Sequence, residues 1–210
     1  MLHTFLDFFF PRHSLTGEEG QWITDAEREQ LISHPVIETK EQLRDREIHF
    51  LDEIRAGSSY HDCPLLKKAI HTFKYRRVRS LAEDLGTLIL IIADWEEGTV
   101  LCPVPLHWTR RFARGFNQSD LLAQVVAQKG GFTVAALLKR TRATGHQMRR
   151  KRRERLTAVR GAFRCMEPRL PERVILIDDL ATTGATLDAC AEVLKNAGVK
   201  RVEGWVVAHG

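Results

Sequence analysis

The stretch Val174-Ile-Leu-Ile-Asp-Asp-Leu-Ala-Thr-Thr-Gly-Ala-Thr186 decides the fold of this chain. Its four consecutive aliphatic residues, 174–177, are typical of a strand that is covered on both faces. Apolar spacing over Leu187–Ala197, ended by Gly198, predicts a helix, and Val202–Val207 predicts another strand. A strand, a helix and a strand at this spacing form a βαβ unit with a right-handed crossover, so we expect a largely parallel sheet.

The polar half of the same stretch predicts a ligand site. Asp178 and Asp179 follow the strand directly, and ligands bind at the carboxyl ends of strands in open α/β sheets. The residues Thr182–Thr186 lie where the next helix begins, and the unpaired N–H groups and dipole of a helix start favour a phosphate. Gly184 permits close approach of the backbone. The carboxylates can accept hydrogen bonds from hydroxyls, and the loop beside them can bind a phosphate. The arrangement therefore suits a sugar phosphate.

Two other interpretations of this stretch are possible. The aspartates could serve only as a solvated strand end and a helix cap. The strand could also be the Walker B strand of an ATPase, but that needs a G-x-x-x-x-G-K-[ST] loop, which the chain lacks. We reject the ATPase interpretation.

Upstream, the pattern alternates between helices and short strands. Val100–Val104, stopped by Pro105, predicts a buried strand, whereas Phe132–Leu138 suits either a strand or a helix. Helices are expected over Leu65–Thr72, Leu81–Trp95 and Asn117–Gln128. The predicted fold class is therefore α/β, a Rossmann-like, largely parallel sheet flanked by helices.

Residues 1–60 differ in composition from the rest, with twelve acids against six bases. Thr24-Asp25 predicts the start of a helix that runs to Ser33, with Glu27 at the position of a capping-box residue. A second helix is expected over Glu38–Arg55.

Gly57-Ser58-Ser59 has the composition of a linker, so we predict a boundary there. The chain would then divide into a small, mainly helical N-terminal region, residues 1–60, and an α/β domain, residues 61–210. A length of 210 residues, with 43% hydrophobic and 28% charged residues, suits one folded domain with an appendage and argues against a wholly disordered chain.

The formal charge of +5 is unevenly distributed. The segment Lys139–Arg164 holds eleven bases and one acid, Glu154, and so carries +10, which leaves −5 for the rest of the chain. A basic cluster on an acidic body indicates a local anionic partner, either substrate phosphates or a nucleic-acid backbone, although a solvated helix face would look the same. The bases are Lys139, Arg140, Arg142, Arg149, Arg150, Lys151, Arg152, Arg153, Arg155, Arg160 and Arg164.

Several classes of protein are disfavoured. The longest apolar run, Leu88–Ala93, is far too short to span a membrane, and Leu2–Phe10 lacks the basic start of a secretory signal. We therefore expect a cytoplasmic protein without membrane insertion. No two of the four cysteines form a C-x-x-C pair, which argues against a zinc knuckle or a redox motif.

Three strings carry a resemblance to known families. Val174–Thr186 resembles the thirteen-residue phosphoribosyl-pyrophosphate (PRPP) signature of type I phosphoribosyltransferases. Cys102–Gln118 resembles the P-V-P-L-H…R-G-F-N-Q string of ComF-family proteins, and Gln147–Phe163 and Phe73-Lys-Tyr75 resemble two further elements of that family. ComF proteins are phosphoribosyltransferase-like factors associated with competence, the uptake of DNA in natural transformation. The resemblance covers roughly residues 63–209.

The resemblance implies a type I phosphoribosyltransferase-like fold and a PRPP site. Asp178 and Asp179 would hold the ribose 2′- and 3′-hydroxyls. The 5′-phosphate would be held by Ala181, Thr182, Thr183, Gly184, Ala185 and Thr186. The pyrophosphate would be held by backbone donors of Leu106, His107 and Trp108 and by the charge of Arg110 or Arg114. His107 is more simply read as a hydrogen-bonded structural residue than as a general base.

The basic segment Thr141–Arg160 resembles the loop that closes over PRPP in this superfamily. Catalytic charge for the leaving pyrophosphate would come from Arg142, Arg153 or Arg155, during displacement at the anomeric carbon through an oxocarbenium-like state. Mg²⁺ is expected with PRPP near Asp178 and Asp179, bound largely by substrate oxygens and waters.

Two classes of function therefore remain open. One is a Mg²⁺-dependent phosphoribosyltransferase with an unknown acceptor, since no side chain is an obvious nucleobase reader. The other is a non-catalytic protein that keeps the PRPP fold and binds single-stranded DNA, with a DNA-uptake helicase as a further partner. Phosphate contacts would come from Arg149, Arg150, Lys151, Arg152 and Arg153, but no stacking aromatic lies between Gly145 and Ala162.

The chain departs from the family at its N-terminus, where ComF proteins usually carry a four-cysteine zinc module. Phe10–Gly17 keeps the shape of F-P-R-C-x-x-C-G, but His13 and Thr16 occupy the cysteine positions. A tetrahedral zinc needs four N or S ligands, and the irregularly spaced His3, His13, His34 and His49 fit solvated surface residues better. Zinc is therefore not expected.

Overall fold

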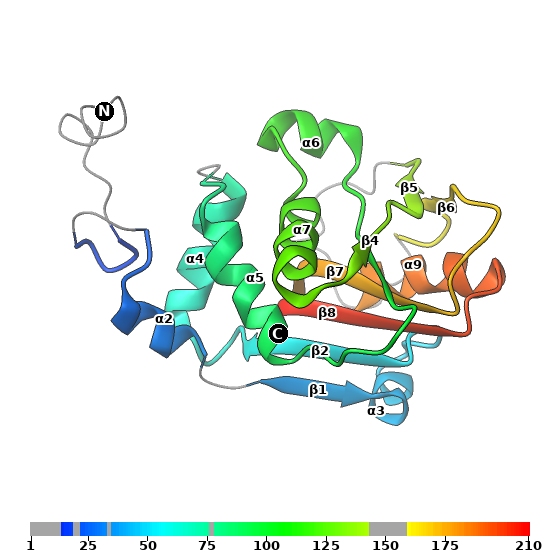
Figure 1. The fold of residues 1–210 in the computed structure, drawn as a ribbon, viewed down its shortest axis with the longest axis horizontal. Coiled ribbons are helices and arrows are strands. Elements are labelled where there is room, and N and C mark those ends of the chain that lie inside the picture. Colours follow the sequence, from blue (N-terminus) through cyan, green and yellow to red (C-terminus); the bar gives the residue numbers. More distant parts are fainter. Residues whose placement is uncertain (1–13, 19–21, 33–34, 76–77, 143–158) are drawn as a thin grey trace.

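A six-stranded sheet forms the centre of the computed structural model, which describes residues 14–18, 22–32, 35–75, 78–142 and 159–210 (Figure 1). The strand order is β1-β2-β8-β7-β3-β4. The strands are β1 (Val36–Thr39), β2 (Glu53–Ser59), β3 (Val100–Pro103), β4 (Thr133–Val134), β7 (Arg173–Ala181) and β8 (Arg201–His209). β1 runs antiparallel to β2, and the other four pairings are parallel. The expected largely parallel sheet is confirmed.

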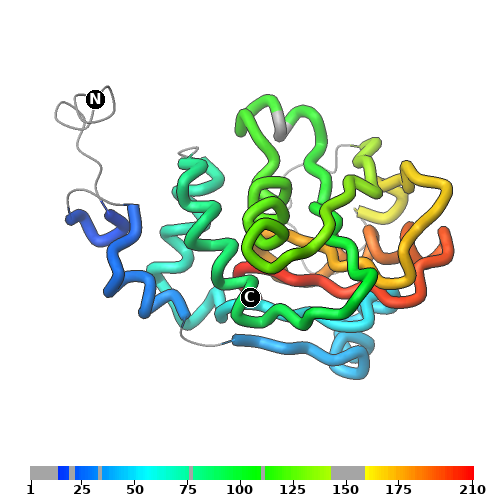
Figure 2. Tube along the Cα trace, viewed as in Figure 1, coloured from blue at the N-terminus to red at the C-terminus, as the bar shows by residue number. Residues whose placement is uncertain are grey.

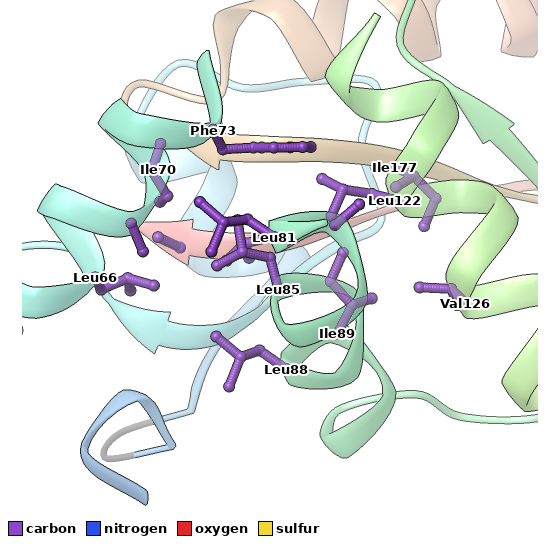
Figure 3. Packing of buried hydrophobic residues seen from close by; sticks show 14 of the residues in the cluster. Leu66, Ile70, Phe73, Leu81, Leu85, Leu88, Ile89, Leu122, Val126 and Ile177 are labelled. Carbon is purple, nitrogen blue, oxygen red and sulfur yellow. The ribbon is translucent and has the colours of Figure 1, made fainter. Parts of the chain in front are cut away.

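Helices cover both faces of this sheet (Figure 1). They are α2 (Asp25–Leu31), α3 (Lys40–Asp45), α4 (Pro64–Tyr75), α5 (Leu81–Ile91), α6 (Trp108–Arg114), α7 (Gln118–Gly130) and α9 (Ala185–Asn196). Side chains alternate along a strand, so Ile175 and Ile177 of β7 pack with α4, α5 and α7, whereas Val174 and Leu176 pack with α9. Figure 3 shows Ile177 together with Phe73 and several leucines on the face of the sheet that α4, α5 and α7 cover.

The predicted βαβ unit is β7, α9 and β8. Residues Val174–Ile177 are fully buried, as four consecutive aliphatic residues in a central strand require. Gly198 follows α9 with a φ of 103° and so turns the chain towards β8. In the trace of Figure 2, β8 (red) lies between β2 and β7, in agreement with the parallel pairing on both sides.

A separate two-stranded ribbon lies beside the main sheet. β5 (Leu138–Arg140) pairs antiparallel with β6 (Phe163–Cys165), and the N–H of Thr141 donates to the carbonyl of Ala162 at 2.9 Å. The ribbon therefore joins the two ends of the basic segment, of which residues 143–158 lie outside the described part of the chain. The ambiguous stretch Phe132–Leu138 contains β4 and the first residue of β5.

The helix predicted over Glu38–Arg55 is wrong. That segment contains the end of β1, the short helix α3 and the start of β2. Pairing decides the outcome, because β2 lies against β8 and buries Ile54 and Ala56 in the core behind α9. Local helix propensity is a weak preference, and tertiary packing overrides it here.

The linker predicted at Gly57-Ser58-Ser59 is also wrong, since these residues are the end of β2. A Cβ atom at Gly57 would lie 2.6 Å from the carbonyl oxygen of Leu88 in α5. The glycine therefore allows a helix backbone to approach the strand closely, rather than giving the chain freedom. Part of the region predicted as an N-terminal appendage thus supplies β1 and β2 to the main sheet.

The predicted capping box is confirmed at the start of α2. Thr24 Oγ1 accepts from the N–H of Glu27, and Glu27 Oε2 accepts from the N–H of Thr24 at 2.7 Å. Among the described residues, no helix combines the length and the apolar character that crossing a membrane requires.

Candidate functional site

The candidate site lies at the carboxyl ends of β3 and β7. The N–H of Val104, just after β3, donates to the carbonyl of Ile177 in β7 at 3.0 Å. Asn117 Nδ2 donates to the carbonyl of Val104 at 3.1 Å and so ties the start of α7 to the same place. The loop after β3, the end of β7 and the start of α7 therefore meet, at the edge of the sheet where ligands bind in open α/β folds.

Asp178 is half-buried at this meeting point. Its Oδ1 accepts from the hydroxyl of Ser119 and from the N–H of Asp179, each at 2.9 Å. Burial and the neighbouring charge of Asp179 raise the pKa of Asp178 to about 6, against the opposing charge of Lys74. A carboxylate in such surroundings gains from any further hydrogen-bond donor or positive charge that a ligand brings.

Asp179 has different surroundings from its neighbour. It is only 5% exposed, and its Oδ1 forms an ion pair of 2.7 Å with Lys74 Nζ from α4. Asp179 lies against Lys74 of α4, whereas Asp178 lies against Ser119 at the start of α7. The two carboxylates expected to bind vicinal hydroxyls together thus occupy distinct environments, and Asp178 is the more accessible.

The predicted phosphate loop links β7 to α9. Gly184 has a φ of 77°, in the left-handed region that favours glycine, and α9 begins at the next residue. Thr183 Oγ1 accepts from the N–H of Ala185 at 3.4 Å. Helix α9, with twelve residues, presents the amino end of its dipole to this loop.

Residues distant in the sequence brace this loop. Arg46 Nη2 donates to the carbonyl of Thr182 at 2.9 Å, and the same guanidinium pairs with Glu38 of β1. His209 Nε2, at the end of β8, lies 3.0 Å from Glu38 Oε2. The loop backbone is thereby attached to β1, to the residue that follows α3, and to β8.

Helix α9 is anchored at its first turn by Asp188. Its Oδ1 accepts from the backbone N–H groups of His49, Phe50 and Leu51, at 3.1, 2.7 and 3.2 Å. The segment before β2 therefore fixes the position of the helix start that carries the loop.

The residues predicted for pyrophosphate lie after β3. Leu106 is half-buried, and His107 is buried with Nδ1 2.9 Å from Thr109 Oγ1, as the interpretation of a structural histidine expects. Trp108 and Arg110 belong to α6. Arg114 Nη1 donates to Gln118 Oε1 at 3.0 Å, and its guanidinium stacks over the ring of Tyr75.

Two polar atoms at the start of α7 have no hydrogen-bond partner within the described part of the chain. They are Oδ1 of Asn117 and Nε2 of Gln118, and both residues are buried. Buried polar groups are nearly always paired in native proteins, by protein, water or ligand. An acceptor and a donor next to Ser119 thus remain for groups that the described part of the chain does not supply.

The predicted lid residues lie mostly outside the described part of the chain, which excludes Arg149–Arg153 and Arg155. Arg142 is exposed, and its Nη2 donates to the carbonyl of Arg160 at 2.7 Å. It therefore lies at the base of the basic segment, where the ribbon ends.

The segment that resembles a zinc module without its cysteines is organised by a carboxylate. Glu27 Oε1 accepts from Ser14 Oγ at 3.0 Å and from the N–H of Thr16 at 2.5 Å. Within the described residues, no group of three or more His, Cys, Asp or Glu side chains could hold a metal ion. His3, His13 and His34 lie outside those residues, so the absence of zinc stays a prediction.

Sequence reasoning missed Lys74, Ser119 and Arg46. Lys74 was part of the quoted Phe73-Lys-Tyr75 element, and Ser119 directly follows the Asn117-Gln118 pair, so both had a signal in the resemblance. No signal in the sequence pointed to Arg46, because its contact with Thr182 of the loop spans 136 residues of sequence.

Comparison with known proteins identifies the family, although no family model matches the chain. The DNA utilization protein YhgH of Salmonella typhi is 33% identical over 154 residues, covering 70% of this chain and 68% of that protein. The chain belongs to the ComF family. Competence protein F of Haemophilus influenzae is 32% identical, covering 52% of this chain and 49% of that protein. The competence protein ComFC of Bacillus subtilis is 29% identical, covering 74% of this chain and 63% of that protein.

A solved structure, that of the allosteric regulatory enzyme of purine biosynthesis, aligns with a TM-score of 0.41 and 20% identity, over 62% of this chain and 26% of that one. The ComF assignment rests on the sequence relatives.

Proposed function

We propose that this ComF-family chain binds PRPP, or a related ribose 5-phosphate, where β3 and β7 end, and transfers the phosphoribosyl group to an acceptor. The observation that carries the proposal is the half-buried Asp178 at the carboxyl end of a central parallel strand, followed by a left-handed glycine and a helix start. Each part of the ligand has a counterpart in this arrangement.

The ribose hydroxyls would donate to Asp178. One of its oxygens already accepts from Ser119 and Asp179, which fixes the orientation of the carboxylate. Asp179 contributes through Lys74, since this ion pair places one positive charge among the two carboxylates. The three groups together carry a single negative charge, which suits neutral hydroxyls better than two unpaired carboxylates would.

The 5′-phosphate would lie on the loop Ala181–Thr186. Free N–H groups at the first turn of a helix and its dipole favour an anion, and the loop lies at the start of α9. Arg46 holds the loop by the carbonyl of Thr182, which leaves the N–H side of that peptide directed away from the contact. The brace therefore preorganises the loop without using the groups that a phosphate needs.

The pyrophosphate would lie towards Leu106–Arg110 and the start of α7. Nε2 of Gln118 supplies a buried donor without a partner among the described residues, and Arg114 is held against that side chain. Burial strengthens a donor's interaction with an anion, because water competes less for it.

The site residues also fit a Mg²⁺ ion that arrives with PRPP. Mg²⁺ prefers oxygen ligands and keeps several waters, so substrate oxygens can supply most of its ligands, with the negative charge of Asp178 close by. When bound, the ion would offset the charge that develops on the leaving pyrophosphate. Arg142, with Arg153 and Arg155 of the same segment, would add positive charge to that group.

The names of the relatives suggest the process that this activity serves. They are called DNA utilization and competence proteins, so we propose a role in the use or uptake of DNA. The acceptor would then be a component of nucleotide or DNA metabolism.

Calorimetric titration of the full chain with PRPP and Mg²⁺ tests the proposal. The wild-type chain should bind, and Asp178→Asn should lower the affinity about 12- to 150-fold, because a charge-assisted hydrogen bond is worth about 1.5–3 kcal/mol. Asp94→Asn is the matched control, since Asp94 lies 3.8 Å from Arg173 at the opposite end of β7 and should bind as wild type does. Ribose 5-phosphate should compete, whereas ribose should not.

Failure of the wild-type chain to bind PRPP with Mg²⁺ would overturn the proposal. Equal loss of affinity in Asp178→Asn and Asp94→Asn would also contradict it, because only Asp178 lies at the predicted site.

A further inference from the structure

The last turn of helix α4 contacts the segment that joins α6 to α7. Phe73 lies in the core (Figure 3), and its ring centroid is 5.7 Å from that of Phe116. Tyr75, the last residue of α4, lies under the guanidinium of Arg114, whose central carbon is 5.5 Å from the ring centroid. Two of the strings that carry the ComF resemblance are far apart in sequence and are thus neighbours in the fold.

Arg114 is held in place by two neutral groups. It is half-buried at the end of α6, its Nη1 donates to Gln118 Oε1 at 3.0 Å, and its guanidinium covers the ring of Tyr75. The ring of His71, one turn earlier in α4, lies 4.7 Å from the ring of Tyr75 and restricts its movement. Within the described part of the chain, no carboxylate pairs with Arg114. Its positive charge is therefore fixed in position but not neutralised.

The two residues that hold Arg114 are sequence neighbours of the residues that hold the two aspartates. The contacts are Ser119 Oγ to Asp178 Oδ1 at 2.9 Å, next to Gln118, and Lys74 Nζ to Asp179 Oδ1 at 2.7 Å, next to Tyr75. The fixed charge of Arg114 therefore lies on the side of the candidate site that α4 and α7 cover.

The chemistry of the ribose ring indicates which ligand group reaches this side. The loop proposed for the 5-phosphate leads into α9, which packs on the opposite face of the sheet from α4 and α7. In ribose, C1 and the carbon that carries the 5-phosphate arm flank the ring oxygen on opposite sides. A ribose held by its hydroxyls at Asp178 therefore directs its C1 group away from α9. In PRPP this group is a diphosphate, and a guanidinium offers several N–H donors to such oxygens.

We propose that Arg114 distinguishes PRPP from ribose 5-phosphate by binding the diphosphate, and that Tyr75 is the positioning residue that holds Arg114 for this contact. The inference rests on the proposed function and names the groups that select the diphosphate. Tyr75 acts only through Arg114. Its ring restricts the rotamers of a long side chain, so less conformational entropy is lost when the ligand binds.

Calorimetric titration of the full chain with PRPP and with ribose 5-phosphate, each with Mg²⁺, tests the inference. Tyr75→Leu should lower the affinity for PRPP about two- to thirtyfold, the range that a cation–π contact spans, and should leave the affinity for ribose 5-phosphate unchanged. Tyr75→Phe keeps the ring and should bind both ligands as the wild type does. Tyr75 is 52% exposed, so circular dichroism should show the same folded signal in both variants.

A second substitution shows whether Tyr75 acts through Arg114. Arg114→Met should lower the affinity for PRPP about 12- to 150-fold, and adding Tyr75→Leu should then have no further effect. Tyr60→Leu is the matched control, because it removes the other tyrosine of the chain, which follows β2 and lies 5.5 Å from the ammonium of Lys67. It should leave the ratio of the two affinities unchanged.

The outcomes separate this inference from the proposed function. Equal affinity of Tyr75→Leu and the wild type for PRPP would overturn the inference. An equal loss of affinity for ribose 5-phosphate, a further loss in the Arg114→Met background, or the same change of ratio in Tyr60→Leu would also overturn it, since each indicates a merely structural role. A wild-type chain that does not bind PRPP refutes the proposed function instead.

Discussion

Replacing Asp178 by asparagine should stabilise the folded chain at neutral pH. The pKa of Asp178 is raised from 3.8 to about 6, chiefly by burial and then by the charge of Asp179. The folded state therefore binds the proton of Asp178 more tightly than the unfolded state does. Protonated Asp178 thus contributes a stability that is fully present below pH 4 and is lost as the pH rises through 6. The full loss amounts to roughly 3 kcal/mol. Asparagine keeps an oxygen that can accept from Ser119 Oγ and from the N–H of Asp179.

Urea unfolding without Mg²⁺ measures this effect. Asp178→Asn should raise the free energy of unfolding by about 1–3 kcal/mol at pH 7.5 and by under about 1 kcal/mol at pH 4. The same variant should lose affinity for PRPP, because it removes the carboxylate to which the ribose hydroxyls would donate. A gain in stability with a loss of binding is common at functional sites. A variant that is no more stable than the wild type at pH 7.5, or that gains equally at both pH values, would refute this reasoning.

Asp52→Asn is the control of opposite sign. Burial raises the pKa of Asp52, but hydrogen bonds from Lys195, Lys40 and the N–H of Val202 outweigh it and hold the pKa below its usual value. Its contribution to stability is therefore present above pH 4 and lost as the pH falls. Asp52→Asn should lower the free energy of unfolding at pH 7.5.

Three further substitutions test the contacts that position the site. Lys74→Met leaves the buried Asp179 unpaired and should cost about 3–5 kcal/mol of unfolding free energy in urea, and Asp179→Asn in the same chain should restore much of it. Asp188→Ala removes the acceptor of three N–H groups in residues 49–51 and should cost about 2–3 kcal/mol, so an unchanged urea midpoint would contradict that role. Gly57→Ala places a Cβ 2.6 Å from a carbonyl of α5 and should lower stability by about 1–3 kcal/mol, measured by thermal unfolding; equal stability would mean that α5 can shift.

The candidate site was largely predictable because its main parts are contiguous in sequence. Strand, carboxylates, loop and helix follow one another within Val174–Ala197, so local patterns sufficed to place them. The different environments of Asp178 and Asp179 were not predictable, because the partners that distinguish them, Ser119 and Lys74, come from α7 and α4.

The failures between residues 38 and 59 have one cause. Ile54 and Ala56 are buried because β2 pairs with β8, a contact that spans about 150 residues of sequence. A helical pattern and a linker composition are local signals, and the free energy of joining the sheet is not local. The solvent exposure of Trp108 and Phe112 in α6 could not be predicted for the same reason, because a sequence does not state which faces of a helix remain uncovered.

The sequence by itself determined the parallel βαβ core, the place of the candidate site and the ComF family, because each depends on short runs of residues. Only the tertiary structure decided which strands complete the sheet, which aspartate stays accessible and which aromatics face solvent. These depend on desolvation and on pairing between distant segments, and such energies exist only once the chain has folded.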